Sequence, residues 1–252
     1  MKQFGKSILY RFPSSFFQRI RFFLTGQDFI GGAIRFAHFK KALRKIPLIS
    51  CVLDAGCGTG DFSFFIAERY PQSTLHAYDI NRKTLQQNTE LQKKIGILNI
   101  SFSCKNLLTL NEQNSYDCIF SIGTLIYFSK QDTKNILLRF TSALQNNGYL
   151  YLDLPQENFL EVAVLPTSWY SSSYTVMKQE NFGELYTFEE MQMLLQEMGY
   201  TLLYVNKSFS YPGKLAWELD NILRERKSNT LRYFFLPFFK ILAHIDAICC
   251  VA

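Results

Sequence analysis

The feature that most constrains this chain of 252 residues is an apolar run that ends in a glycine-rich turn. It covers residues 52 to 61, which read Val52-Leu53-Asp54-Ala55-Gly56-Cys57-Gly58-Thr59-Gly60-Asp61. Glycine tolerates backbone angles that other residues avoid, and it has no Cβ to keep a ligand away from the backbone. The pattern therefore predicts a strand that leads through a tight turn into a helix.

A second apolar run ends in Tyr78-Asp79-Ile80, with Asp79 nineteen residues beyond Gly60. A carboxylate at the end of the second strand can accept hydrogen bonds from the hydroxyls of a ribose. Ligands of open α/β sheets bind beyond the carboxyl ends of the strands. The two runs together predict a pocket for a cofactor that contains a nucleoside.

The glycine spacing distinguishes between nucleoside cofactors. Dinucleotide sites have the pattern G-x-G-x-x-G, whereas this turn has G-x-G-x-G, and a pattern started at Gly58 places Ser63 at the third glycine. Asp54 lies two residues before Gly56, the first glycine of the loop. Its carboxylate would repel a pyrophosphate and attract an ammonium or a sulfonium. A nicotinamide cofactor is therefore disfavoured.

The leading acid, the glycine loop and the second acid resemble motif I and the ribose-binding acid of the class I S-adenosylmethionine (SAM) methyltransferases. The resemblance covers about residues 50 to 155. It implies SAM as the cofactor and a Rossmann-like fold. The cofactor-binding residues that it implies are Asp54 for the amino group, Gly56, Gly58 and Gly60 beside the methionine part, Asp79 for the ribose, Ile80 beside the adenine, and Asn106 for the adenine amine. Asn106 replaces an Asp that is common in the family, and it could instead be a simple turn residue.

The catalytic residues are less clearly indicated. Many members of the family have V-L-E-H after the fourth strand, where this chain has Thr124-Leu125-Ile126-Tyr127, so that the acid and the histidine are both absent. Tyr127 could orient a substrate hydroxyl, although a buried structural tyrosine is the expected alternative. His38 is a candidate base, since a histidine titrates near neutral pH. Asp153 and Glu157 are further candidates.

Missing motifs and aromatic segments suggest the acceptor class. The chain has no N-P-P-Y turn and no Pro-Cys pair, which argues against planar amines and cytosine carbon. We expect methyl transfer to a hydroxyl, carboxyl or ring carbon of a small or lipid-like acceptor. The alternatives are a catalytically silent SAM-fold partner protein and, with less support, an RNA methyltransferase.

Strand and helix patterns alternate after residue 50, which is typical of a mostly parallel α/β sheet with helices on both faces. The expected strands are Cys51–Asp54, Thr74–Asp79, Ile100–Cys104, Asp117–Ile122, Gly148–Leu154 and Thr201–Lys207. The expected helices are Ala33–Lys45, Phe62–Arg69, Arg82–Ile95, Asp132–Leu144 and Phe188–Met198, and Gly31-Gly32 is expected to end a preceding helix. The family has a seventh, antiparallel strand. Only Ala247–Ala252 remains to form it, so the sheet is expected to have six or seven strands.

Composition suggests three regions. Residues 1–50 form a basic, aromatic, helical segment with ten Lys or Arg and one acid, Asp28. Residues 51–208 form the SAM-binding domain, in which 156–186 would cover the substrate. Residues 209–252 form a second helical, basic and aromatic segment.

The basic ends allow more than one partner. They fit amphipathic helices with solvated faces, or contact with an anionic membrane surface, whereas nucleic acid is unlikely. With no signal sequence and no apolar stretch of about 20 residues, we expect a cytoplasmic protein that could be peripheral on a membrane; an organelle transit peptide is a weaker alternative.

The cysteines suggest no metal site. None of the six forms a C-x-x-C pair, and the chain has three histidines, so no metal is expected. Buried reduced thiols would fit a reducing cytosol. Cys249-Cys250-Val251-Ala252 matches a prenylation pattern, but these residues also fit a final strand.

Overall fold

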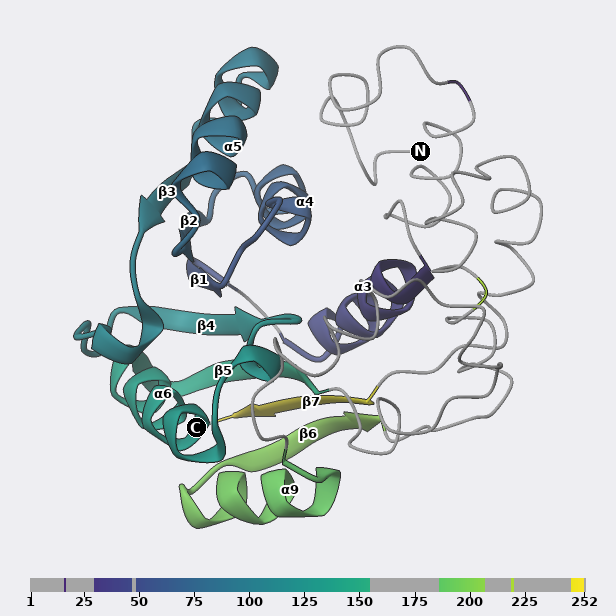
Figure 1. Ribbon diagram of the computed structural model, residues 1–252, viewed down its shortest axis with the longest axis vertical. Helices are drawn as coiled ribbons and strands as arrows, with labels where there is room; N and C mark the ends of the chain where they lie inside the picture. The colour runs from purple at the N-terminus through teal and green to yellow at the C-terminus, as the bar shows by residue number, and fades with distance from the viewer. Residues whose placement is uncertain are drawn as a thin grey trace, which may run out of the picture.

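The computed structural model describes residues 30–46, 49–154, 186–206 and 246–251, together with Phe16 and Leu219. These residues form a twisted seven-stranded sheet with the order β3-β2-β1-β4-β5-β7-β6 (Figure 1). The strands are β1 (Cys51–Ala55), β2 (Thr74–Asp79), β3 (Ile100–Cys104), β4 (Tyr116–Ser121), β5 (Leu144–Leu154), β6 (Thr201–Asn206) and β7 (Asp246–Val251). The predicted Rossmann-like α/β fold is confirmed.

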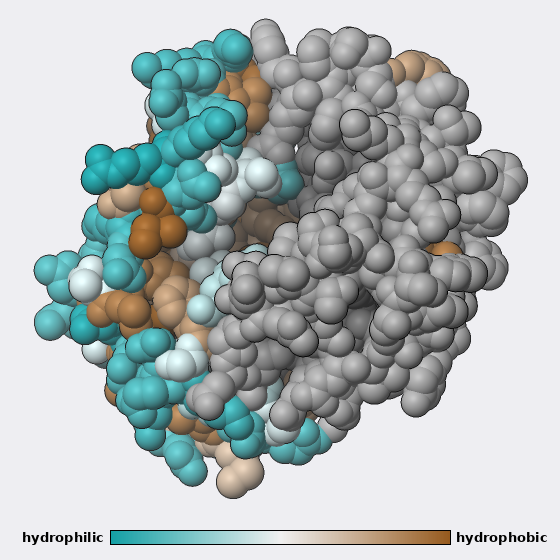
Figure 2. Space-filling view, viewed as in Figure 1, coloured by the Kyte–Doolittle hydropathy of each residue, from teal (hydrophilic) through white to brown (hydrophobic). Residues whose placement is uncertain are grey.

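The helices alternate with the strands as the sequence predicts. They are α3 (Ile30–Leu43), α4 (Asp61–Arg69), α5 (Arg82–Ile95), α6 (Lys130–Ala143) and α9 (Phe188–Glu197), with short 3-10 turns η1 (Leu107–Thr109) and η2 (Leu125–Tyr127). Thr187 and Glu190 form the predicted capping box of α9, which satisfies two backbone N–H groups at the helix start. Hydrophilic residues cover the outer side of α5 (Figure 2).

One helix start was predicted wrongly. The helix after Gly31-Gly32 was expected to begin at Ala33, but α3 begins at Ile30 and includes both glycines. A glycine in a helix costs only about 1 kcal/mol. Burial of the apolar residues farther along α3 is large enough to offset that cost.

The strand directions create the position of the site. β1 pairs in parallel with β2 on one side and with β4 on the other, so the chain reverses its direction of winding between these neighbours. Such a switch point leaves a crevice at the carboxyl ends of the strands. The crevice lies where the glycine-rich turn follows β1.

The sheet contains the seventh, antiparallel strand whose presence the sequence left open. β7 is present and lies between β5 and β6, antiparallel to both. Cys249 of β7 is in register with Tyr151 and with Tyr204. The last cysteines therefore belong to a strand in the interior of the sheet.

Each face of the sheet has its own apolar core, because successive residues of a strand point to opposite faces. One core joins α3, α4 and α5 to β-strand residues such as Val52 and Phe120. The other joins α6 and α9 to residues such as Leu53 and Ile119. Figure 1 shows the two sets of helices on opposite sides of the sheet.

Helix α3 belongs to the first core. Phe36 and Phe39 are fully buried, and the ring of Phe39 lies 5.0 Å from that of Phe120 and 5.1 Å from that of Tyr151. Truncating such a side chain to alanine costs about 3–5 kcal/mol. The part of the basic N-terminal segment that the structure describes is thus packed on the sheet.

Several predictions fall outside the described residues. They concern residues 1–29 of the first basic segment apart from Phe16, the 156–186 cover segment up to 185, and residues 207–245 apart from Leu219. Among the helices that the structure describes, none combines the length and the apolar character needed to cross a membrane.

Candidate functional site

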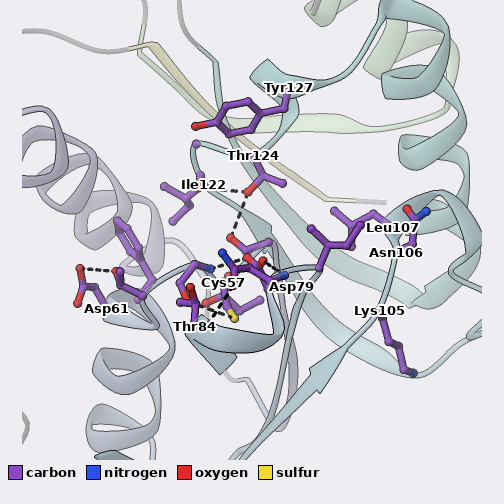
Figure 3. Close-up of a pocket in the computed structure, with 18 of the residues that line it drawn as sticks. Cys57, Asp61, Asp79, Thr84, Lys105, Asn106, Leu107, Ile122, Thr124 and Tyr127 are labelled. Carbon is purple, nitrogen blue, oxygen red and sulfur yellow. Dashed lines mark hydrogen bonds between the residues drawn. The ribbon is translucent and has the colours of Figure 1, made fainter. Parts of the chain in front are cut away.

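A cavity of about 780 Å³ opens at the switch point, beyond the carboxyl ends of β1, β2 and β4 (Figure 3). The residues that line it include these candidates from the sequence analysis: Asp54, Gly56, Gly58, Asp79, Ile80, Asn106 and Tyr127. Gly60 is absent from the lining; it precedes α4 with a φ of 75° and accepts the first helical hydrogen bond from Phe64. Its role among the described residues is to start the helix.

The glycine loop is fixed to the end of β2 by backbone hydrogen bonds. The N–H groups of Gly56 and Cys57 both donate to the carbonyl oxygen of Tyr78, at 2.8 and 2.9 Å. Gly56 has a φ of 87°, and a Cβ placed on it would lie 2.2 Å from Thr124 Oγ1. Glycine is therefore required here both by the backbone angle and by the close approach of Thr124.

Asp79 connects the loop to β2. Its Oδ2 accepts a hydrogen bond from the Gly58 N–H at 2.8 Å, and its Oδ1 accepts one from the Asn81 N–H at 2.8 Å. These bonds fix the orientation of the carboxylate. Each carboxylate oxygen can accept a further bond, so Asp79 keeps capacity for a diol that enters the cavity.

Asp54 lies at the floor of the cavity and is 2% exposed. Burial raises the pKa of Asp54 to about 7; the Ser63 hydroxyl, which donates to it at 2.5 Å, opposes the shift, and the charge of Asp79 adds to it. The ionised form is thus poorly solvated by the protein alone. A cation that approached it would favour ionisation, so Asp54 fits an ammonium partner.

The end of the cavity beyond β2 and β3 combines apolar and polar groups. Ile80 is 72% exposed and presents an apolar surface on which a planar ring can pack. Asn106 Oδ1 accepts a hydrogen bond from the Leu108 N–H at 3.0 Å, which caps η1. The simple turn role is therefore present, and the second lone pair of this oxygen remains able to accept a bond from a ligand amine.

A polar network that sequence reasoning missed lies beneath this end. Lys105 forms an ion pair with Glu112 and donates to Tyr78 Oη at 3.1 Å. Tyr78 Oη is also 2.9 Å from Tyr116 Oη, and burial raises the pKa of the Tyr116 phenol. Figure 3 shows the Lys105 side chain directed away from the glycine loop. The network joins β2, β3 and β4, and no local sequence pattern indicates it.

Tyr127 corrects one expectation. The sequence favoured a buried structural tyrosine, but Tyr127 is 59% exposed and lines the cavity from η2 (Figure 3). The reason is the 3-10 turn, which buries Leu125 and Ile126 and leaves the third side chain outside. Its phenol stands at the position of the histidine in the V-L-E-H pattern, and Ile126 stands at the position of the acid.

His38 lies away from the cavity wall. Its side chain is 7% exposed, and Nδ1 lies 2.8 Å from Tyr204 Oη of β6. This bond connects α3 to the far edge of the sheet. The placement gives His38 a structural contact and does not bring it to the residues that line the cavity.

Asp153 is also held by protein partners. It is 1% exposed, its Oδ2 lies 2.5 Å from Arg35 Nε, and its Oδ1 accepts a hydrogen bond from the Gly123 N–H. Arg35, in contrast, does line the cavity, although no sequence pattern indicated it. Glu157, the other candidate acid, lies outside the described residues.

The residues fit a SAM-type cofactor. The cavity joins a glycine loop without side chains, an oriented carboxylate at the end of β2, a buried acid and an apolar wall. A Cβ on Gly58 would meet nothing within 4 Å, which leaves open space in front of that part of the loop. These are the groups needed to bind an amino acid part and a nucleoside in one crevice.

Comparison with known proteins agrees with this geometry. A family described as "Methyltransferase domain" matches residues 50–203. Phosphoethanolamine N-methyltransferase 1 of Arabidopsis thaliana is 23% identical over 179 residues, which are 70% of this chain and 34% of that protein. Malonyl-[acyl-carrier protein] O-methyltransferase 1 of Ilyobacter polytropus is 32% identical over 80 residues, or 32% of this chain and 29% of that protein. The chain thus spans about a third of the length of these curated relatives.

A solved structure extends the likeness over almost the whole fold. The structure of a putative sarcosine dimethylglycine methyltransferase from Galdieria sulphuraria superimposes with a TM-score of 0.61 at 15% identity. The match covers 94% of this chain and 98% of the other. At that identity, the likeness concerns the fold.

Proposed function

Because the chain belongs to the class I SAM-dependent methyltransferases, we propose that it transfers the methyl group of SAM to a small or lipid-like acceptor. The family and the cofactor predicted from the sequence are confirmed. The acceptor, the atom methylated and the site of action in the cell belong to the proposal. We favour a hydroxyl, carboxyl or ring carbon as the methylated group.

One observation carries the proposal. The carboxylate of Asp79 accepts the N–H of Gly58 and faces the same cavity as Asp54 and Tyr127. The cavity thus has an end suited to the nucleoside of SAM, a centre suited to its amino acid part, and a third wall, formed by η2, that neither of these parts occupies. An acceptor at that third wall would lie close to the centre of the cavity.

When bound, SAM would supply a methyl group on a positively charged sulfur. The acceptor would form a bond to that carbon while the sulfur–carbon bond breaks, and an acceptor that carries a proton would release it. The protein has to align the acceptor and exclude water. Tyr127 can orient an acceptor by a hydrogen bond. A carboxylate is ionised at neutral pH and needs no base, which suits a wall where Ile126 and Tyr127 stand in place of the acid and the histidine. The O-methyltransferase relative is consistent with that preference.

Calorimetric titration with SAM, with NAD as the control ligand, tests the cofactor site. Asp79→Ala should weaken SAM binding by about 1–3 kcal/mol, because the ribose hydroxyls lose their acceptor. Glu90→Ala on the exposed side of α5 is the matched control and should bind SAM normally. Unchanged SAM affinity of Asp79→Ala would contradict the assignment.

Membrane contact is a separate part of the proposal, supported by the basic and aromatic ends of the sequence. Flotation with anionic vesicles tests it. Deleting 221–252 would remove β7, so the better variant replaces Arg11, Arg19 and Arg21 by Glu and leaves the sheet intact. Loss of flotation supports peripheral binding; equal flotation contradicts a role of this segment.

A catalytically silent partner protein is the second candidate. The absence of the acid and the histidine near Tyr127 is the observation that favours it. Incubation with methyl-labelled SAM and fractionated small-molecule and lipid extracts distinguishes the two. Tight SAM binding with no labelled product in any fraction would favour the partner protein.

A further inference from the structure

Arg35 is a cation in the wall of the cavity, contributed by α3 from outside the segment that carries the cofactor motifs. It lies at the same part of the wall as Ile122, Gly123 and Thr124. The residues assigned to the adenine, Ile80 and Asn106, follow β2 and β3 and approach from other elements. Arg35 therefore belongs to the part of the cavity that the acceptor would occupy.

The guanidinium forms an ion pair with a buried carboxylate. Its Nε lies 2.5 Å from Oδ2 of Asp153, which is almost fully buried at the end of β5. The other oxygen of Asp153 accepts the Gly123 N–H. One buried carboxylate thus positions both the arginine and the loop after β4.

Gly123 makes room for this arrangement. It has a φ of 66°, and a Cβ placed on it would lie 3.3 Å from Nη1 and 3.4 Å from Cζ of Arg35. The guanidinium therefore lies directly over the Gly123 backbone. The ion pair with Asp153 is recorded at Nε, and the guanidinium carries further N–H donors on Nη1 and Nη2.

A guanidinium held in this way suits a planar oxyanion. Its two terminal nitrogens can donate two parallel hydrogen bonds to a carboxylate or a phosphate. A side chain that is already oriented loses less conformational entropy on binding. The arginine is 22% exposed, so solvent reaches it without screening it fully.

The other charged residues in the cavity wall lie elsewhere or are paired within the protein. Asp54 and Asp79 are placed around the glycine loop, and Asp61 begins α4, where its Oδ2 accepts from Thr59 Oγ1 at 3.2 Å. The second cation of the wall, Lys105, is paired with Glu112. Among the described lining residues, Arg35 is thus the cation best placed for an anionic ligand.

We propose that Arg35 binds a carboxylate or phosphate group of the acceptor, so that the protein selects acceptors carrying an oxyanion, and that Asp153 is the positioning residue for Arg35. The proposal rests on the methyltransferase function proposed above. It turns a general small or lipid-like acceptor into one with a defined charge. Asp153 acts as a support in this scheme and has no role as a base.

The experiment uses the full chain saturated with S-adenosylhomocysteine and titrates it with malonate and, separately, with phosphoethanolamine. The wild type should bind at least one of them, and the stronger probe tells a carboxylate site from a phosphate site. Arg35→Gln should weaken that binding at least tenfold and change SAM affinity less than twofold. Lys41→Gln, an exposed cation of the same helix, is the matched control and should bind the probe like the wild type.

A second variant separates binding from folding. Arg35→Gln alone leaves the buried Asp153 without its cation, which is destabilising, whereas Arg35→Gln with Asp153→Asn removes both charges. The double variant should regain thermal stability without regaining probe binding. The proposal would be overturned if either variant bound the probe as tightly as the wild type does. It would also be overturned if the wild type bound SAM but neither probe. A wild type that does not bind SAM would instead contradict the proposed function itself.

Discussion

Replacing Gly56 by alanine should destabilise the protein far more than replacing Gly58 by alanine, although both belong to the same loop. Both glycines have a positive φ, 87° at Gly56 and 47° at Gly58. The surroundings differ. A Cβ on Gly58 meets nothing within 4 Å, whereas a Cβ on Gly56 would lie 2.2 Å from Oγ1 and 2.3 Å from Cγ2 of Thr124.

The magnitudes follow from these two contributions. A left-handed backbone costs a non-glycine residue about 1–2 kcal/mol, and this is the whole expected cost at Gly58. Overpacking adds about 1–3 kcal/mol at Gly56, because Thr124 donates to the Gly56 carbonyl and is held in place. With about 2–4 °C per kcal/mol for a domain of this size, Gly58→Ala should lower Tm by about 4 °C and Gly56→Ala by roughly 10 °C.

Thermal unfolding without cofactor, followed by circular dichroism, measures both. Adding Thr124→Ala to Gly56→Ala removes the two nearest atoms and should recover part of the difference, but the backbone strain remains. Equal Tm values for the two alanine variants would refute the reasoning, since the contact with Thr124 would then have no energetic consequence.

Two further predictions concern buried polar groups. Burial raises the pKa of Asp54 from its ordinary 3.8 to about 7. Between these two pH values the folded state keeps a proton that the unfolded chain releases. The stability that this protonated carboxyl contributes is complete below about pH 4 and is lost as the pH rises through 7. Asp54→Asn should therefore be more stable than the wild type at pH 8, by at most about 4 kcal/mol, and should show no such gain at pH 4. Urea unfolding at the two pH values measures this difference. A gain in stability that does not depend on pH would contradict the prediction. Tyr204→Phe removes the hydroxyl bonded to His38 and should cost about 1 kcal/mol of stability with no effect on SAM affinity; weakened SAM binding in calorimetry would show that His38 communicates with the site.

The sequence predicted the parts of the fold that have local signals. The bounds of β2 and α5 agree with the prediction because the helix is flanked by Asn81, which caps it, and by Gly96 in a left-handed conformation. The start of β5 was placed too late, at Gly148, because Asn146 and Asn147 are typical of a turn, yet the strand begins at Leu144 with an irregular pairing to β4.

The cofactor side of the site was predictable for the same reason. Asp54, Gly58 and Asp79 lie at ends of neighbouring strands, where chain order alone brings them together. The acceptor side was not, since Arg35 and Asp153 meet through the packing of α3 on the sheet. Contacts between residues so far apart in the chain leave no periodicity and no spacing from which they could be inferred.

The position of β7 also has a consequence for biosynthesis. β6 is made before β7, yet β7 separates it from β5 and is its partner in the sheet. A ribosome that has released residues up to β6 has therefore produced a strand whose neighbour does not yet exist. The first five strands can pair in the order of synthesis or by a single crossover, but β6 has to wait with an exposed edge, which is a site of wrong pairing. Errors in folding should therefore concentrate at this end of the sheet, far from the cofactor loop, until β7 has been synthesised.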